Sequence, residues 1–337
     1  MKGAPITISN IARLLGLSKS TVSRALRDHP DISAETTEKV KKVARDLHYR
    51  PNIVASSLRQ KKSSLIGVIV PQISCFFFPL ILQGIENITR QKSYNLLILH
   101  SNESYEREVE CLDILLANNV EGILASVSRT TGNFDHFKRV ADMKLPMVFY
   151  DRVVPGLNAD TVMIDDIAAS CSAVHHLISS GRSRIAICTG NMNLLISRNR
   201  LNGYRKALKE AGLPVNENRI MSCEWPEEAE AAIYRLFSSQ DPPDAVFTIN
   251  DLTTSGVMRA MYRMKKKIPE EVAIIGFSEE PFRSLYCPAL TAVEPKGFDI
   301  GKVAAEILMD RIENKADEHF TPYDIKLQAD LIVKNST

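Results

Sequence analysis

The sequence predicts an all-α helix-turn-helix head plus an α/β core that forms two doubly wound parallel-sheet lobes. Three observations support this: capped amphipathic helices near the N-terminus, apolar strands that alternate with helices afterwards, and more strands than one open sheet accommodates. At roughly 150 residues per domain, the 337 residues allow two or three domains. We expect residues 1–50 to form the head, 51–64 a hinge helix and linker, and 65–337 the core.

Composition indicates an ordinary folded protein with an uneven charge. Hydrophobic residues make up 45% and charged residues 24%, which argues against disorder. No apolar run reaches the ~18 residues that span a bilayer, and the N-terminus lacks a secretory signal, so we expect a cytoplasmic protein. Residues 1–62 contain 13 Lys and Arg against 5 Asp and Glu, whereas residues 63–337 contain 29 against 35. The basic head predicts a polyanionic partner, with a solvated basic surface as the alternative.

Capping signals divide the head into three short helices. Thr7 can cap a first helix, which Gly16 ends because glycine readily adopts the positive φ of a tight turn. Ser18 caps a second helix over residues 19–27, and Ser33 caps a third that runs to residue 47. A helix, a short glycine turn and a second helix form the helix-turn-helix unit.

The second helix carries a face suited to DNA. Its outward residues combine short hydroxyl side chains with bases: Lys19, Ser20, Thr21, Ser23, Arg24 and Arg27. A helix fits the major groove, short side chains allow a close approach, and Lys or Arg can donate to guanine or phosphate. The alternative is an ordinary capped surface helix, since serine and threonine are common at helix starts.

The segment after the head is too short to fold as an independent helix. Pro51 is acceptable at a helix start, but the turns that follow should order only against a second copy or DNA, because helix nucleation is costly. Leu58 lies among basic residues without an evident core to join. It could enter the minor groove and unstack a base step, or it could belong to a plain linker.

The order of these motifs points to one family. TVSRAL in the second helix, a serine-capped third helix, YRPN and a hinge leucine together resemble the lactose-repressor (LacI-type) family of bacterial transcription regulators. The resemblance implies that the second helix contacts the operator and that Leu58, beside Ala55, is the minor-groove lever of a hinge helix. The DNA-binding set that we expect is Thr7, Ser18, Lys19, Ser20, Thr21, Ser23, Arg24, Tyr49, Asn52, Ala55 and Leu58. Two departures are Ser56, where many members carry arginine, and His48, where a glycine commonly ends the third helix.

The rest of the chain alternates apolar runs with helical patterns. The nine predicted strands are residues 65–70, 95–100, 122–126, 147–151, 161–165, 185–190, 244–250, 272–277 and 290–293. Helical patterns separate most of them, for example over residues 79–91, 106–118, 167–179 and 198–211. This alternation predicts parallel sheets covered on both faces, whose ligands bind at the carboxyl ends of the strands. We therefore expect a ligand cleft between the two lobes.

Polar and aromatic residues recur at these strand ends. The candidate effector site consists of Phe77, Phe78, Asn102, Asp151, Arg152, Arg200, Trp225, Asn250, Asp251 and Ser278. Carboxylates, amides and guanidinium groups can bind hydroxyls, while flat rings cover the apolar face of a sugar. Each residue alone has an ordinary alternative role in a core or a helix cap. Their recurrence at strand ends favours a cleft that binds a sugar or sugar derivative.

The resemblance extends over the core, which is similar to periplasmic sugar-binding proteins. It implies crossovers near Met163, Pro295 and Tyr323, so that the head-proximal lobe comprises 65–163 and 296–323 and the distal lobe 164–295 and 324–337. The effector-side positions that it implies are Asp151, Arg200, Trp225, Asn250 and Asp251. Departures from the family pattern, which predict an unusual effector, occur at Gln72, Cys75, Ser278 and Pro295.

The sequence does not predict catalysis, a cofactor or a metal site. It lacks the phosphate-loop, dinucleotide, nucleophile-elbow and zinc-protease motifs. Adjacent His175 and His176 point apart on a helix. The six cysteines show no C-x-x-C spacing, so we expect reduced thiols and no zinc site; they are Cys75, Cys111, Cys171, Cys188, Cys223 and Cys287.

Together these features predict a transcriptional repressor whose affinity for near-palindromic operator DNA is controlled by a small-molecule effector. The resemblance implies a homodimer whose seam includes residues 78–91 and 106–116. No leucine heptads follow LIVKNST, so we do not expect a tetramerising coiled coil, and we expect no membrane partner. The alternative is a sugar-binding receptor without a DNA role, against which the basic head and the missing leader argue.

Overall fold

The computed structural model describes residues 6–49, 62–74, 77–314 and 321–337. The chain divides into two compact units, Met1–Ser63 and Ser64–Thr337. Each unit has its own hydrophobic core. None of the helices in the described ranges is long and apolar enough to cross a bilayer.

The first unit is a three-helix head whose ends match the predicted caps. Its helices are α1 Ile8–Leu15, α2 Lys19–Ala25 and α3 Ala34–Asp46. Gly16 ends α1 with a φ of 64°, which an L side chain rarely adopts. The Ser18 hydroxyl accepts from the Thr21 backbone N–H at 3.0 Å and so begins α2. One apolar residue from each helix is fully buried at the centre: Ile11, Val22 and Val40.

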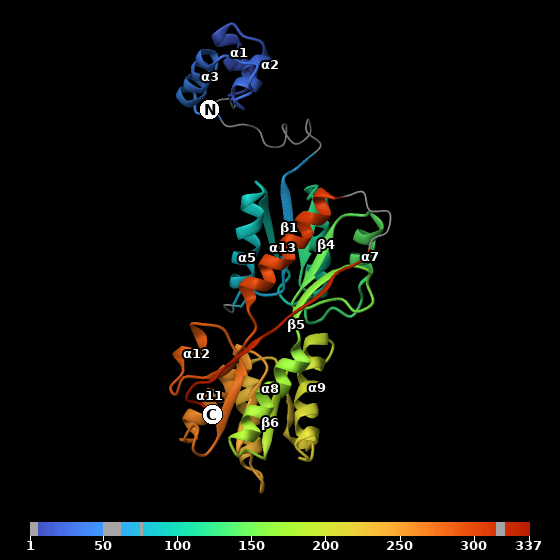
Figure 1. Cartoon of the computed structure of the whole chain (residues 1–337), viewed down its shortest axis with the longest axis vertical. Helices are drawn as coiled ribbons and strands as arrows, with labels where there is room; N and C mark the ends of the chain where they lie inside the picture. The colour runs from blue at the N-terminus through green and yellow to red at the C-terminus, as the bar shows by residue number, and fades with distance from the viewer. Residues whose placement is uncertain (1–5, 50–61, 75–76, 315–320) are drawn as a thin grey trace. The chain divides into compact units, whose positions relative to one another are not determined.

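The second unit contains two six-stranded sheets, one in each lobe (Figure 1). The first sheet is parallel throughout, in the order β11-β5-β4-β3-β1-β2. Its strands are β1 Leu65–Val70, β2 Asn95–His100, β3 Gly122–Ala125, β4 Met147–Tyr150, β5 Asp160–Ile164 and β11 Asp324–Leu327. The second sheet has the order β12-β10-β9-β8-β6-β7. Its strands are β6 Ile185–Thr189, β7 Ile220–Ser222, β8 Ala245–Thr248, β9 Ala273–Phe277, β10 Thr291–Glu294 and β12 Asp330–Ile332, which alone in this sheet is antiparallel.

Helices follow most of the strands, as doubly wound sheets require. Those of the first lobe are α5 Phe77–Gln91, α6 Tyr105–Ala117, α7 Asp135–Asp142 and α13 Gly297–Glu313. Those of the second are α8 Asp166–Ser179, α9 Leu195–Glu210, α10 Pro226–Phe237, α11 Asp251–Arg263 and α12 Phe282–Leu285, with a 3₁₀ turn at Glu217–Arg219. The predicted fold class is thereby confirmed.

Helices α5 and α13 pack closely against each other over the first sheet (Figure 1). Glycine makes this approach possible on both helices. A Cβ added at Gly301 would lie 2.0 Å from the Ile81 carbonyl oxygen, and one at Gly84 would lie 2.1 Å from the Phe298 carbonyl oxygen. This contact fixes the helix that follows Pro295 onto the first lobe, although the strand before it belongs to the second.

Three short strands are missing from the sequence prediction: β7, β11 and β12. All three lie at sheet edges, where burial is partial and no continuous apolar run is needed. The third crossover consequently comes after Leu327 and not near Tyr323, because residues 324–327 pair with β5 of the first sheet. Helix α9 also begins earlier than predicted, at Leu195 and not at Arg198.

Candidate functional site

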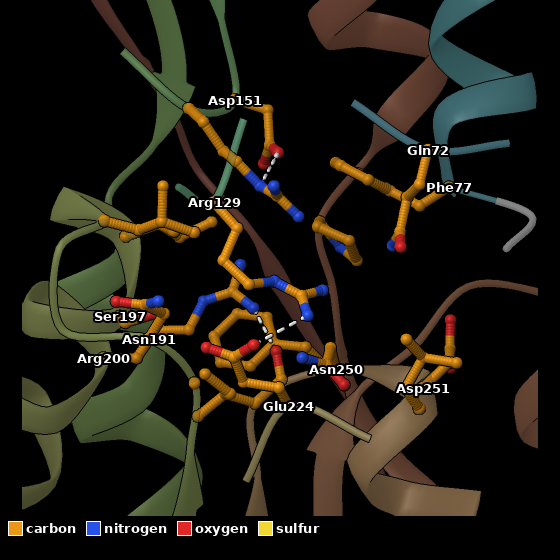
Figure 2. Close-up of a pocket in the computed structure, with 18 of the residues that line it drawn as sticks. Gln72, Phe77, Arg129, Asp151, Asn191, Ser197, Arg200, Glu224, Asn250 and Asp251 are labelled. Atoms are coloured by element: carbon orange, nitrogen blue, oxygen red, sulfur yellow. Dashed lines mark hydrogen bonds and ion pairs between the residues drawn. The ribbon is translucent and has the colours of Figure 1, made fainter. Parts of the chain in front are cut away.

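A pocket lies where the carboxyl ends of the strands of the two lobes face each other (Figure 2). It encloses about 870 Å³, including space that is open to solvent, and both lobes contribute residues. The lining consists of Gln72, Phe77, Phe78, Arg129, Asp151, Arg152, Gly190, Asn191, Leu194, Ile196, Ser197, Arg200, Cys223, Glu224, Ile249, Asn250, Asp251, Leu252, Phe277, Ser278, Glu279 and Pro295.

On the first-lobe side, Asp151 follows β4 in a left-handed backbone conformation and is buried. Burial raises the pKa of this carboxyl to about 6, although the nearby guanidinium groups of Arg152 and Arg200 act in the opposite direction. Arg152 Nε lies 3.9 Å from the Asp151 carboxylate, beyond hydrogen-bond distance. The Arg152 Nη1 atom instead donates to both carboxylate oxygens of Glu103, at 3.0 and 2.8 Å. Within the described residues, Asp151 thus faces Arg152 as an ion pair but is not hydrogen-bonded to it.

On the second-lobe side, Arg200 makes two hydrogen bonds to the protein and lies over an aromatic ring. Its Nε donates to Asp166 at the start of α8 at 2.7 Å, and its Nη1 donates to the Ile249 carbonyl. The guanidinium carbon lies 3.6 Å from the centre of the Phe277 ring. These contacts orient Arg200 firmly and neutralise its charge.

A second carboxylate enters the pocket from α11. Asn250 caps this helix by accepting from the Thr253 backbone N–H at 2.9 Å, and Asp251 is its first residue. The Ser278 hydroxyl donates to Asp251 at 2.5 Å. Burial raises the pKa of Asp251 to about 6, against the opposing effects of the Ser278 hydrogen bond and the Arg200 charge.

A salt bridge joins the two lobes across the pocket. Arg129, from the loop after β3, donates through Nη1 to Glu224 of the second lobe at 2.9 Å, and Figure 2 shows Arg129 directed into the pocket toward this carboxylate. The guanidinium also lies 4.9 Å from the centre of the Trp225 ring. On its own side, the Arg129 backbone N–H donates to Glu103 at 2.8 Å.

The structure brings together eight of the ten predicted effector residues: Phe77, Phe78, Asp151, Arg152, Arg200, Asn250, Asp251 and Ser278. Asn102 does not line the pocket, because it is exposed and its neighbour Glu103 points toward Arg152 and Arg129. Trp225 does not line the pocket either; it is 48% exposed, and its ring lies 4.9 Å from the Arg129 guanidinium. Sequence reasoning missed Arg129 and Glu224, although Arg129 follows the third predicted strand and the rule of strand ends applies to it.

On the head, the predicted DNA-contacting face is largely available. Lys19, Ser20 and Arg24 are exposed on α2. Ser23 is a correction, because it is only 7% exposed and lies on the buried side beside Val22. Of the other predicted residues, Thr7 and Ser18 are exposed caps and Thr21 and Tyr49 are half-buried. The predicted hinge residues Asn52, Ala55, Ser56 and Leu58 lie outside the described residues.

Two family models match the chain. Residues 7–52 match "Bacterial regulatory proteins, lacI family", and residues 63–335 match "Periplasmic binding proteins and sugar binding domain of LacI family". The chain belongs to the LacI family. This family consists of DNA-binding transcriptional regulators, in which the head belongs to the DNA-binding domain and the pocket to the sugar-binding-like domain. The resemblance inferred from the sequence is confirmed.

Curated relatives of this LacI-family chain cover almost all of its length. Catabolite control protein A of Priestia megaterium is 31% identical over 90% of this chain and 91% of its own length. The ribose operon repressor of Bacillus subtilis is 32% identical over 92% of each chain. The transcriptional repressor PurR of Vibrio parahaemolyticus is 29% identical over 98% of each chain.

Solved structures of the family share the fold. The lac repressor dimer bound to operator and an anti-inducer aligns with a TM-score of 0.87 over 99% of both chains at 22% identity. The regulator CcpA of Lactococcus lactis aligns with a TM-score of 0.73 at 25% identity, over 81% of this chain and 98% of its own.

Proposed function

We propose that this regulator is a homodimeric repressor whose pocket binds an uncharged, hydroxyl-rich effector, a carbohydrate or carbohydrate derivative. The proposal rests mainly on how the carboxylates and guanidinium groups of the pocket are paired. Asp151 and Asp251 are buried carboxylates of raised pKa that have no arginine hydrogen-bonded to them, one on each lobe. Buried carboxylates need donors, and the hydroxyl groups of a sugar supply them.

The arginines of the pocket are already neutralised, which argues against an anionic effector. Arg129 pairs with Glu224, Arg152 with Glu103, and Arg200 with Asp166. A phosphate or a carboxylate on the ligand would have to displace one of these protein carboxylates. It would also approach the two acceptors on the lobes, which is electrostatically unfavourable.

An aromatic ring adds to the match to a sugar. Phe77, on the first-lobe side of the pocket, is half-buried, whereas Phe78 and Phe277 are buried and the Arg200 guanidinium already lies over the Phe277 ring. Flat apolar rings cover the C–H face of a pyranose while the carboxylates take its hydroxyls. The Arg152 guanidinium lies 5.6 Å from the centre of the Phe78 ring, so this aromatic surface is tied to the polar part of the site.

The effector class is tested by thermal shift of the full-length protein against four panels: neutral sugars, sugar acids, sugar phosphates and nucleosides. Ligand binding raises the apparent stability by mass action. We expect stabilisation by one or more neutral sugars, and a changed gel shift with the same compound. Stabilisation by phosphorylated or acidic sugars alone would refute the proposal that the effector is uncharged.

For DNA, we propose that two heads read the half-sites of a near-palindromic operator through α2, with Leu58 and its mate from the other copy entering the central step. The exposed face of Lys19, Ser20 and Arg24 supports this role. Residues 78–91 and 106–116 are the proposed dimer seam, where Ile114 is 44% exposed. Effector coupling of about 1–3 kcal/mol would change operator affinity five- to 150-fold.

A gel shift against genomic fragments, with bulk competitor DNA, tests the DNA role. We expect a preferred fragment upstream of a regulated gene, bound by a dimer in sedimentation analysis. Equal affinity for all fragments, with or without sugars, would favour a receptor without a DNA role.

A further inference from the structure

A cluster of mixed ligand atoms joins helices α8 and α9 of the second lobe, on residues that do not line the effector pocket. Cys171 and His175 lie four positions apart on α8 and therefore share a face of that helix. Glu210 is the last residue of α9. The sequence prediction of no zinc site rests on the absence of C-x-x-C spacing, a signal that does not detect ligands contributed by two helices.

Glycine packing brings the three side chains together. A Cβ added at Gly203 of α9 would lie 2.5 Å from the Ile167 carbonyl oxygen, so the two helices approach closely there. Glu210 follows Gly203 by two helical turns and lies on the same face of α9. The close contact at Gly203 thus directs the end of α9 onto Cys171 and His175.

The distances suit a small tetrahedral ion. The Glu210 carboxylate oxygen lies 2.8 Å from His175 Nε2 and 3.5 Å from Cys171 Sγ. All three ligand atoms lie within 4.8 Å of one another. With metal–ligand bonds of roughly 2.0–2.3 Å, the ligands of tetrahedral zinc are separated by about 3.5 Å. Shifts of a few tenths of an ångström to about one ångström would therefore place an ion between them.

We propose that Cys171, His175 and Glu210 bind one zinc ion that staples α8 to α9. Thiolate, imidazole and carboxylate are the zinc donors of proteins. The Cys171 side chain is buried, whereas the side chains of His175 and Glu210 are 43% and 47% exposed, so water can reach a fourth position. On binding, the thiol proton passes to solvent and a thiolate–zinc bond forms.

One neighbouring residue affects how tightly the cluster could bind zinc, and the position of the two helices determines what zinc binding would stabilise. Lys206 Nζ lies 3.9 Å from the other Glu210 oxygen and would have to move away from the ion. Toward their opposite ends, the same two helices carry Asp166 and Arg200, which are hydrogen-bonded to each other, and Arg200 lines the pocket. A staple at the far end would stabilise the pair of helices that positions Arg200.

The test uses the full-length protein, stripped with a chelator and titrated with Zn²⁺ against a chromophoric competitor. We expect one zinc ion per chain, a higher melting temperature on loading, and, with Co²⁺ as a substitute, the visible spectrum of a tetrahedral site with a thiolate ligand. Cys171→Ala and His175→Gln should weaken zinc binding by about 100-fold or more, and Glu210→Gln by at least about tenfold.

The matched control is Cys287→Ala, which removes an exposed thiol elsewhere in the second lobe and should bind zinc as the unmodified chain does. Glu210→Gln changes a half-exposed side chain, so it also covers the case in which the Cys171 variant fails to fold. Absence of stoichiometric zinc binding would overturn the proposal and leave a hydrogen-bonded cluster only. Unchanged affinity in all three variants would place any bound zinc elsewhere and overturn it equally.

Discussion

Replacing Asp151 by asparagine should make the effector-free protein more stable at neutral pH while weakening effector binding. The Asp151 carboxylate is buried, and its pKa is raised from 3.8 to about 6 chiefly by burial. Asparagine has nearly the same shape and bears no charge. The substitution therefore removes the cost of holding an ionised carboxylate in the pocket and also removes an acceptor for the ligand.

The magnitude follows from proton linkage. A raised carboxyl pKa means that the folded state binds a proton more tightly than the unfolded chain, so ionisation costs stability above the folded pKa. Raising the pKa of Asp151 from 3.8 to about 6 corresponds to about 3 kcal/mol at pH values well above 6. As the pH falls through the folded pKa toward 3.8, the cost disappears. The advantage of the asparagine variant should thus be about 3 kcal/mol near pH 7.5 and about half of that near pH 5.

Urea unfolding of both proteins across this pH range measures the difference. Asp142→Asn, at the exposed end of α7, is the matched control and should show no pH-dependent advantage. The reasoning is refuted if Asp151→Asn is no more stable than the unmodified chain at neutral pH, or if its advantage grows as the pH falls. Effector titration of the same variant should give a lower affinity.

Three further predictions concern packing, the pocket and the hinge. Gly301→Ala should destabilise the core by several kcal/mol in urea unfolding, because its Cβ would lie 2.0 Å from a carbonyl oxygen of α5, whereas Gly132→Ala, with open space around it, should be nearly neutral. Arg200→Ala should abolish the gel-shift response to an effector sugar while operator binding survives, and a retained response would show that the pocket is misassigned. The same substitution should lower the free energy of unfolding by about 3–5 kcal/mol, because buried Asp166 loses its partner. Leu58→Ala should weaken operator binding much more than non-specific DNA binding in competition assays, and equal losses would contradict a lever role.

Local signals explain why the head could be predicted well from the sequence. Ser18 accepts from the third backbone N–H that follows it, and Gly16 takes the left-handed turn, so each boundary depends on one or two residues. The position of Ser23 could not be predicted in this way. Whether a small side chain next to Val22 faces inward depends on how closely the neighbouring helices pack, which is a tertiary property.

The pocket was partly predictable because a parallel sheet gathers the ends of its strands at one edge. Asn250 and Ser278 follow the neighbouring strands β8 and β9 of the second sheet and meet for that reason, whereas Asp151 follows β4 of the first sheet and joins them from the other lobe. The salt bridge between Arg129 and Glu224 depends on how the two lobes face each other, and neither strand-end pattern contains that information. The same limit applies to the Cys171, His175 and Glu210 cluster, whose members meet only through the packing of two helices.

The distribution of charge in the pocket links effector binding to the arrangement of the lobes. Asp151 belongs to the first lobe and Asp251 to the second, and each is a buried carboxylate whose raised pKa records the cost of burial. A ligand can offset the free-energy cost of burying both carboxylates if its hydroxyls donate to both of them. It can do so only while the two lobes lie at the separation that the ligand spans. Its binding free energy therefore favours one lobe arrangement over others, which is the differential affinity that a ligand-controlled switch requires. The Arg129–Glu224 salt bridge already joins the lobes in the arrangement that the structure shows. A ligand that fits this arrangement adds to an existing preference, and one that separates Arg129 from Glu224 must first overcome it.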